Sequence, residues 1–106
     1  MRQLIITCND QNAGVLTEYD DRHYTFVYDD EYLVSNNPSI SITLPKRKEE
    51  FSSPYLFPFF TNLLPEGANK RYICRRNHID DKDQMGLLTS FTGKDFIGNI
   101  GVRIIN

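Results

Sequence analysis

Cysteine and histidine are scarce in this sequence, with two of each among its 106 residues. Cys8 and Cys74 lie far apart and form no Cys-x-x-Cys pair. We expect both to be small buried residues, and the sequence alone leaves a disulfide between them open. His23 and His78 each fall at the start or end of a predicted element, which favours surface positions for both. The sequence therefore predicts no metal site.

A strong excess of charge of either sign is also missing, because the net charge is only −2. So small a charge gives no extended field to attract nucleic acid or an anionic membrane. The charges are nevertheless segregated: six acids lie between Glu18 and Glu31, and four bases without an acid lie between Lys70 and Arg76. One acidic and one basic region suit a protein partner, although a solvated surface produces the same pattern.

No hydrophobic run is long enough to span a bilayer. The longest apolar-rich stretch, residues 55–64, is interrupted by Pro58, and the first ten residues lack the apolar core of a signal peptide. With 40% hydrophobic and 25% charged residues, the composition is typical of a globular protein. We therefore predict a reduced, cytoplasmic protein with one domain over residues 1–106.

The first half of the chain has the pattern of β-strands. Residues 23–29 alternate Tyr24, Phe26 and Tyr28 with polar or smaller residues, the period of a half-buried strand. A hairpin is predicted before it, with its turn at Asn12–Gly14. Ile40, Ile42 and Leu44 alternate with Ser and Thr, which predicts a further strand that ends at Pro45. The remaining predicted strands are 3–8, 15–19 and 99–105, while 31–35 is ambiguous.

The apolar segment that follows predicts a helix. Ser52 or Ser53 can serve as N-cap with Pro54 in the first helical position, where a missing N–H costs nothing. Pro58 then falls at the edge of the first turn, so the helix either starts late or bends there. Pro65 must end it, because the residue before a proline is disfavoured in the α region.

Two further helices complete the prediction. One spans about Glu66 to Asn77, with Tyr72 and Ile73 facing inward, and one is capped by Asp80 with Asp83 in its first turn. The apolar face and C-terminal cap of the latter are Leu87, Leu88, Phe91 and Gly93. This order predicts an α+β fold: a small, mostly antiparallel sheet of N-terminal strands and one C-terminal strand, packed with about three helices from residues 53–92.

Catalytic motifs are not recognisable. Gly93-Lys94 resembles the end of a phosphate loop, but the other required positions hold Leu88 and Asp95. The paired aspartates are typical of turns and helix caps rather than of an acid and base pair. We therefore predict that the chain is not an enzyme, with no catalytic residue and no cofactor.

Four segments together resemble the N-terminal subdomain of HipA-type Ser/Thr kinases, the toxins of bacterial toxin–antitoxin systems. That family has a strand of alternating Leu and Ser ending in Pro, and then a helix ending Phe-Phe-x-Asn-Leu-Leu-Pro-Glu-Gly. A Gly-Leu-Leu helix and a glycine-containing last strand follow. The matching segments here are Ile40–Pro45, Phe59–Gly67, Gly86–Leu88 and Gly98–Val102. The opening hairpin with Gly14-Val15-Leu16 also matches, so the resemblance covers essentially the whole chain.

The resemblance implies a role in binding rather than catalysis. In a full HipA kinase the subdomain precedes the catalytic region, whereas this chain ends at Asn106, so we expect no kinase activity from it alone. Three-gene systems carry a free-standing version, HipS, which binds a shortened HipT kinase as its antitoxin. The sequence looks like such a stand-alone version. The implied partners are a HipA- or HipT-like kinase and, through the complex, a HipB-like helix-turn-helix repressor, with DNA reached only indirectly and no membrane involved.

The corner after the apolar helix is the expected kinase contact. Phe59, Phe60, Leu63 and Leu64 would anchor it in the core, while the following residues face the partner: Pro65, Glu66, Gly67, Ala68, Asn69, Lys70 and Arg71. The sequence departs from related chains at Ala68, where these often carry a bulky aromatic residue. Two alternatives stay open. The chain could be the detached N-terminal half of a split HipA, needed for assembly or repressor-complex formation. It could also be a small nucleic-acid-binding protein that uses the basic face of residues 70–76.

Overall fold

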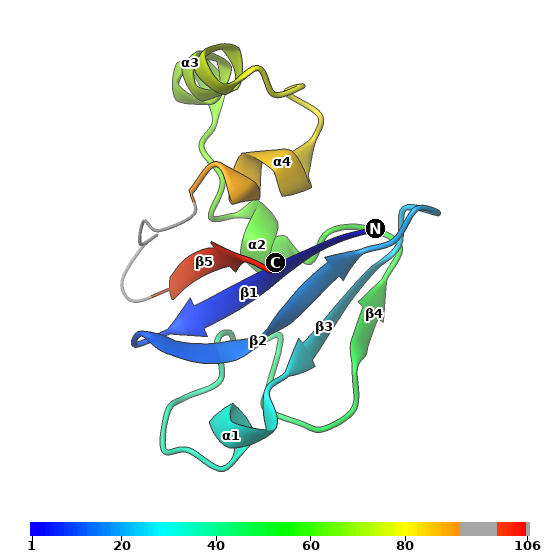
Figure 1. The fold of residues 1–106 in the computed structure, drawn as a ribbon, viewed down its shortest axis with the longest axis vertical. Coiled ribbons are helices and arrows are strands. Elements are labelled where there is room, and N and C mark those ends of the chain that lie inside the picture. Colours follow the sequence, from blue (N-terminus) through cyan, green and yellow to red (C-terminus); the bar gives the residue numbers. More distant parts are fainter. Residues whose placement is uncertain (92–99, 106) are drawn as a thin grey trace.

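A five-stranded antiparallel sheet forms the centre of the molecule, with strand order β4-β3-β2-β1-β5 (Figure 1). The computed structural model describes residues 1–91 and 100–105. Its elements are β1 (Arg2–Cys8), β2 (Gln11–Glu18), β3 (Tyr24–Tyr28), α1 (Asp30–Leu33), β4 (Phe51–Ser53), α2 (Pro58–Thr61), α3 (Gly67–Asn77), α4 (Gln84–Thr89) and β5 (Ile100–Ile104). The α+β prediction is confirmed, including the return of the chain to the sheet as its last strand, which pairs with β1.

The first hairpin turns earlier than predicted. Asn9 and Asp10 both have positive φ, and Cys8 pairs with Gln11 across them, so these two residues form the turn. The predicted turn at Asn12–Gly14 was wrong, because that segment lies within β2. Asn and Asp tolerate the left-handed conformation better than other residues with a side chain, which lets the chain turn at the first such pair.

The core lies on one face of the sheet and continues into the segments around α2 and α4. Phe26, Phe60, Leu16 and Leu88 are fully buried within it. Rings form much of this packing, with Phe60 beside Phe26, Phe57 and Phe59. Phe59, Leu63 and Leu64 are half-buried against the same cluster. The predicted anchoring of the corner in the core is thus confirmed.

The predicted strand at residues 40–44 is instead a tight turn. Ile40 and Leu44 are 7% and 2% exposed, but Ile42 between them is 97% exposed, so the three do not share one face. The hydroxyl of Tyr28 accepts a hydrogen bond from the N–H of Ile40 and donates one to the carbonyl of Leu44, which holds both ends of the segment. Ser41 accepts from the N–H of Thr43 (3.2 Å) and closes the turn. The ambiguous segment after β3 forms the short helix α1.

The helix predicted from Ser52 or Ser53 starts late. Both serines lie in β4, which pairs with β3 and buries Phe51 against Phe26. Helix α2 begins at Pro58, in the first helical position that suits a proline, and Phe57 is its N-cap. Burial of a strand residue thus outweighs the capping signal of the serines.

Helix α4 is capped by Asp83 and not by Asp80. The Asp83 carboxylate accepts a hydrogen bond from the N–H of Gly86 (3.1 Å), while Asp80 accepts from the N–H of Lys82 (2.9 Å) in the preceding turn. The prediction that Tyr72 faces inward was also wrong, since its side chain is 62% exposed. The cap predicted at Gly93 lies outside the described residues.

Candidate partner-binding surface

The corner between α2 and α3 is built from a buried approach and an exposed turn. After α2, the N–H of Leu63 and of Leu64 donate to the carbonyls of Phe60 and Thr61, which continues the turn up to Pro65. Glu66 then takes an extended conformation as the N-cap of α3, and Gly67 begins the helix with φ +60°. A side chain at this φ is strained, although the space around Gly67 is open. Glycine is thus required here for its conformation rather than its size.

The predicted contact residues form one continuous stretch of surface. Pro65 and Lys70 are half-buried, and the other five are exposed: Glu66, Gly67, Ala68, Asn69 and Arg71. The Glu66 side chain makes no capping hydrogen bond, and the first turn of α3 carries no acid. The five exposed residues are therefore accessible to a partner. That they contact a kinase stays a prediction.

Helix α3 extends this surface beyond the predicted kinase contact, along the basic face of residues 70–76 that the sequence also indicates. Tyr72, Arg75 and Arg76 are exposed, and Nη1 of Arg76 donates to the Tyr72 hydroxyl (3.1 Å). Within the helix Cys74 is buried, and Lys70 and Ile73 are half-buried. In Figure 1 it lies at one end of the molecule, away from the sheet. The sequence indicates this face, because residues 71, 72, 75 and 76 recur at helical spacing and three are arginines.

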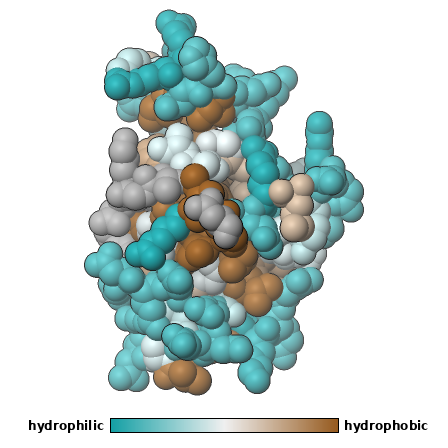
Figure 2. Space-filling model, in the orientation of Figure 1, coloured by the Kyte–Doolittle hydropathy of each residue, from teal (hydrophilic) through white to brown (hydrophobic). Residues whose placement is uncertain are grey.

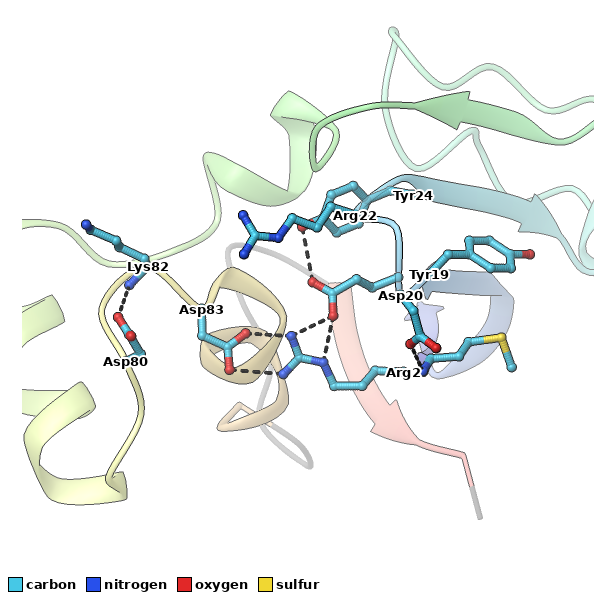
Figure 3. A pocket seen from close by; sticks show the side chains of 10 residues that line it. Arg2, Tyr19, Asp20, Arg22, Tyr24, Asp80, Lys82 and Asp83 are labelled. Atoms are coloured by element: carbon cyan, nitrogen blue, oxygen red, sulfur yellow. Dashed lines mark hydrogen bonds and ion pairs between the residues drawn. The ribbon is translucent and has the colours of Figure 1, made fainter.

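A polar hollow of about 590 Å³ lies on another side, where the N-terminus meets the segment before α4 (Figure 3). Arg2 is held there between two carboxylates: its Nη1 and Nη2 donate to Asp83 (3.0 and 2.6 Å), and its Nε donates to Glu18 (2.8 Å). The hydrogen bond from Arg2, together with that from the N–H of Gly86, lowers the pKa of Asp83 below its ordinary value. The Tyr24 hydroxyl donates to the other oxygen of Glu18.

The contacts of Arg2 make it a structural tie across the hollow. The Arg2 guanidinium binds the carboxylate of Glu18 in β2 and that of Asp83, the N-cap of α4. Burial chiefly raises the pKa of Tyr24, so that its hydroxyl stays protonated near neutral pH. Arg2 thereby joins β1 and β2 to the start of α4.

The other candidate chemical groups are also separated. Cys8 and Cys74 are buried and not joined by a disulfide, which closes the question that the sequence left open. His78 is exposed in the left-handed conformation that ends α3, and His23 contacts Asp21 (2.6 Å) in the hairpin before β3. Within residues 1–91 and 100–105, no three His, Cys, Asp or Glu side chains come close enough to hold a metal ion. The helices of that part are too short and too polar to cross a membrane.

Comparison with known proteins gives a consistent result. The sequence model of the HipA N-terminal domain family matches residues 4–103. An uncharacterised protein of Haemophilus influenzae (strain ATCC 51907 / DSM 11121 / KW20 / Rd) is 30% identical over 90 residues, which are 85% of this chain and 80% of that one. A solved structure described as the N-terminal domain of HipA toxin superposes with a TM-score of 0.72 at 24% identity, over 100% of this chain and 96% of that chain.

Proposed function

Because the chain belongs to the HipA N-terminal domain family, we propose that it is a non-catalytic, HipS-like binding subunit of a toxin–antitoxin system. In this role it binds a separately encoded HipA- or HipT-like Ser/Thr kinase and neutralises it. The relative from Haemophilus influenzae supports the idea of a separate subunit, since the aligned 90 residues already make up 80% of it. That relative is itself a short chain.

The observation that carries the proposal is the exposed corner on a packed base. Phe60 is fully buried and Leu63 and Leu64 are half-buried, so the approach to the corner is fixed before any partner arrives. Glu66 to Asn69 follow it as an exposed turn at the start of α3. A surface that is already ordered loses less entropy on binding, which favours a specific protein contact.

A second role has support from the solved neighbour, which is a domain of a HipA toxin and not a free antitoxin. By this alternative, the chain is the detached half of a split HipA and helps its kinase to assemble or to join a HipB-like repressor. DNA would then be reached only through the complex. Both roles require the same kinase contact, and they differ in the sign of the effect on the kinase.

Co-expression with the HipA- or HipT-like kinase of the same genome tests the proposal. We expect the two proteins to copurify and the chain to restore growth that the kinase arrests. Reversal of Lys70 and Arg71 to glutamate should weaken both effects, whereas Lys48→Glu, on an exposed loop far along the chain from the corner, should weaken neither. Copurification without growth rescue would support the split-HipA role. If the wild-type chain fails to copurify, the binding role itself is wrong.

A further inference from the structure

Helix α3 presents one face that is basic and aromatic along its length. Arg71 and Arg75 lie one turn apart, as do Tyr72 and Arg76, so the four side chains form one outer stripe. All four are exposed, whereas Ile73 and Cys74 on the other side of the helix are half-buried and buried. Figure 2 shows hydrophilic atoms over this end of the molecule. The stripe of Arg71, Tyr72, Arg75 and Arg76 is called the α3 face below.

The arginines of the α3 face differ from Arg2 in having no acidic partner among the described residues. Arg2 is bound between Glu18 and Asp83. Arg47 lies over the ring of Phe51, 3.7 Å from its centroid, and donates to backbone carbonyls. Within the described part of the chain, by contrast, no ion pair with a carboxylate is formed by the three arginines of α3. Most of their hydrogen-bond donors are therefore open to a partner.

We propose that the α3 face is a docking surface for a carboxylate-rich patch on the partner kinase, with Tyr72 as its central anchor. This inference rests on the proposed function and extends its contact from the corner to the far end of α3. Arginine matches carboxylates with two parallel hydrogen bonds, and Tyr and Arg are the residues most enriched among energetically dominant interface positions. The hydrogen bond from Arg76 to the Tyr72 hydroxyl holds both side chains in place before contact.

The charge of the whole chain favours a protein patch over nucleic acid as the occupant. Nucleic-acid-binding domains are typically basic overall, whereas this chain has a net charge of −2 and acidic residues concentrated between Glu18 and Glu31. A long nucleic acid would be repelled by those acids, whereas an acidic patch on a protein partner would contact only α3. Such a contact steers the approach of two proteins, so it raises the association rate and responds to salt.

The test compares association kinetics of charge variants with the purified kinase at low and physiological salt. We expect Arg75→Glu with Arg76→Glu to slow association at least tenfold at low salt and to remove most of its salt dependence. Tyr72→Ala should instead speed dissociation at least tenfold. Lys48→Glu is the matched control and should change either rate by less than twofold. All four side chains are exposed, so the variants should unfold at the wild-type temperature, which circular dichroism checks.

Each outcome separates this inference from the proposed function. If the wild-type chain binds the kinase and the double variant binds with the same rates and salt dependence, the α3 face is not the docking surface and the proposed function stands. No binding by the wild-type chain overturns both. Binding of a duplex DNA probe at physiological salt that is lost in the double variant would assign the face to nucleic acid. A wild-type dimer in sedimentation that the double variant dissolves would assign it to a second copy.

Discussion

Removal of the Tyr28 hydroxyl is the sharpest test of how the turn at residues 40–44 is held. Tyr28 is 3% exposed, and its hydroxyl bonds to backbone groups at both ends of the turn. Tyr28→Phe keeps the ring and therefore its edge-to-face contact with Phe26 (5.0 Å between centroids) and its packing beside Tyr32 (5.9 Å). The change deletes two hydrogen bonds and no apolar contact.

The cost follows from the groups that lose their partner. The N–H of Ile40 and the carbonyl of Leu44 belong to buried residues, so water cannot readily replace the hydroxyl. A buried polar group left without a hydrogen bond costs about 1–3 kcal/mol. We therefore expect Tyr28→Phe to lower the free energy of unfolding by about 2–6 kcal/mol, since two such groups are affected. For a domain of this size, each kcal/mol corresponds to about 4–8 °C in melting temperature.

Urea unfolding measures the change in the free energy of unfolding of the whole protein. Hydrogen exchange of the Ile40 amide measures the loss of protection in the turn itself. We expect a lower urea midpoint and an Ile40 amide that exchanges at least tenfold faster than in the wild type. Tyr55→Phe is the matched control because Tyr55 is 77% exposed and its hydroxyl holds no turn; it should change stability by less than about 0.5 kcal/mol. An unchanged midpoint together with an Ile40 amide that stays protected would refute the account of the turn.

Two further predictions concern the ion-pair tie and the hairpin. The hydrogen bond from Arg2 keeps the pKa of Asp83 below its unfolded value, so the stabilisation is present above the unfolded pKa and is lost as pH falls through the folded pKa. The melting temperature should therefore fall more steeply between about pH 5 and pH 2 in the wild type than in Asp83→Asn. Asp81→Asn is the control. Equal slopes of melting temperature against pH in the wild type and Asp83→Asn would contradict this prediction. Gly14→Ala should lower the free energy of unfolding by about 1–3 kcal/mol, because the new Cβ would lie 2.4 Å from the backbone oxygen of Val27. If the variant has the urea midpoint of the wild type, a Cβ at position 14 is not crowded.

The parts of the fold that were predictable are those where burial and local pattern agree. Tyr24, Phe26 and Tyr28 alternate with smaller residues and form β3 with Phe26 and Tyr28 buried. Helix α3 likewise ends at Asn77 as expected, whereas α2 already ends at Thr61, short of the end predicted at Pro65. In β3 one short segment carries enough information, because its side-chain period fixes the backbone without help from distant residues.

The errors in the predicted fold arise where a residue distant in sequence binds the backbone of the segment. Ile40, Ile42 and Leu44 have the period of a strand, but the Tyr28 hydroxyl binds the backbone at both ends of the segment and leaves Ile42 outside. Ser41 adds a local side-chain hydrogen bond that competes with strand pairing. The alternation of apolar and polar residues is the same whether the segment forms a strand or a turn, so only the position of Tyr28 decides between the two.

The ion pairs of Arg2 could not be predicted from the sequence for a similar reason. Arg2 and Asp83 are 81 positions apart, and no periodic pattern connects them. Asp83 looked like a first-turn acid and Asp80 like the cap, because both fit the composition of a helix start. Arg2 stabilises the ionised form of Asp83 where its carboxylate also accepts the Gly86 N–H, so the pairing supports the cap at Asp83.

The corner combines a buried and an exposed half, and this division determines how its variants can be interpreted. Phe60 is fully buried, so a change there would alter stability and binding together and could not locate a contact. Lys70 is half-buried and Arg71 exposed, and neither belongs to the hydrophobic core. A loss of kinase binding at those two positions, with an unchanged melting temperature, therefore reports on the interface itself. The same reasoning separates the exposed α3 face from Cys74, which is buried on the other side of the helix.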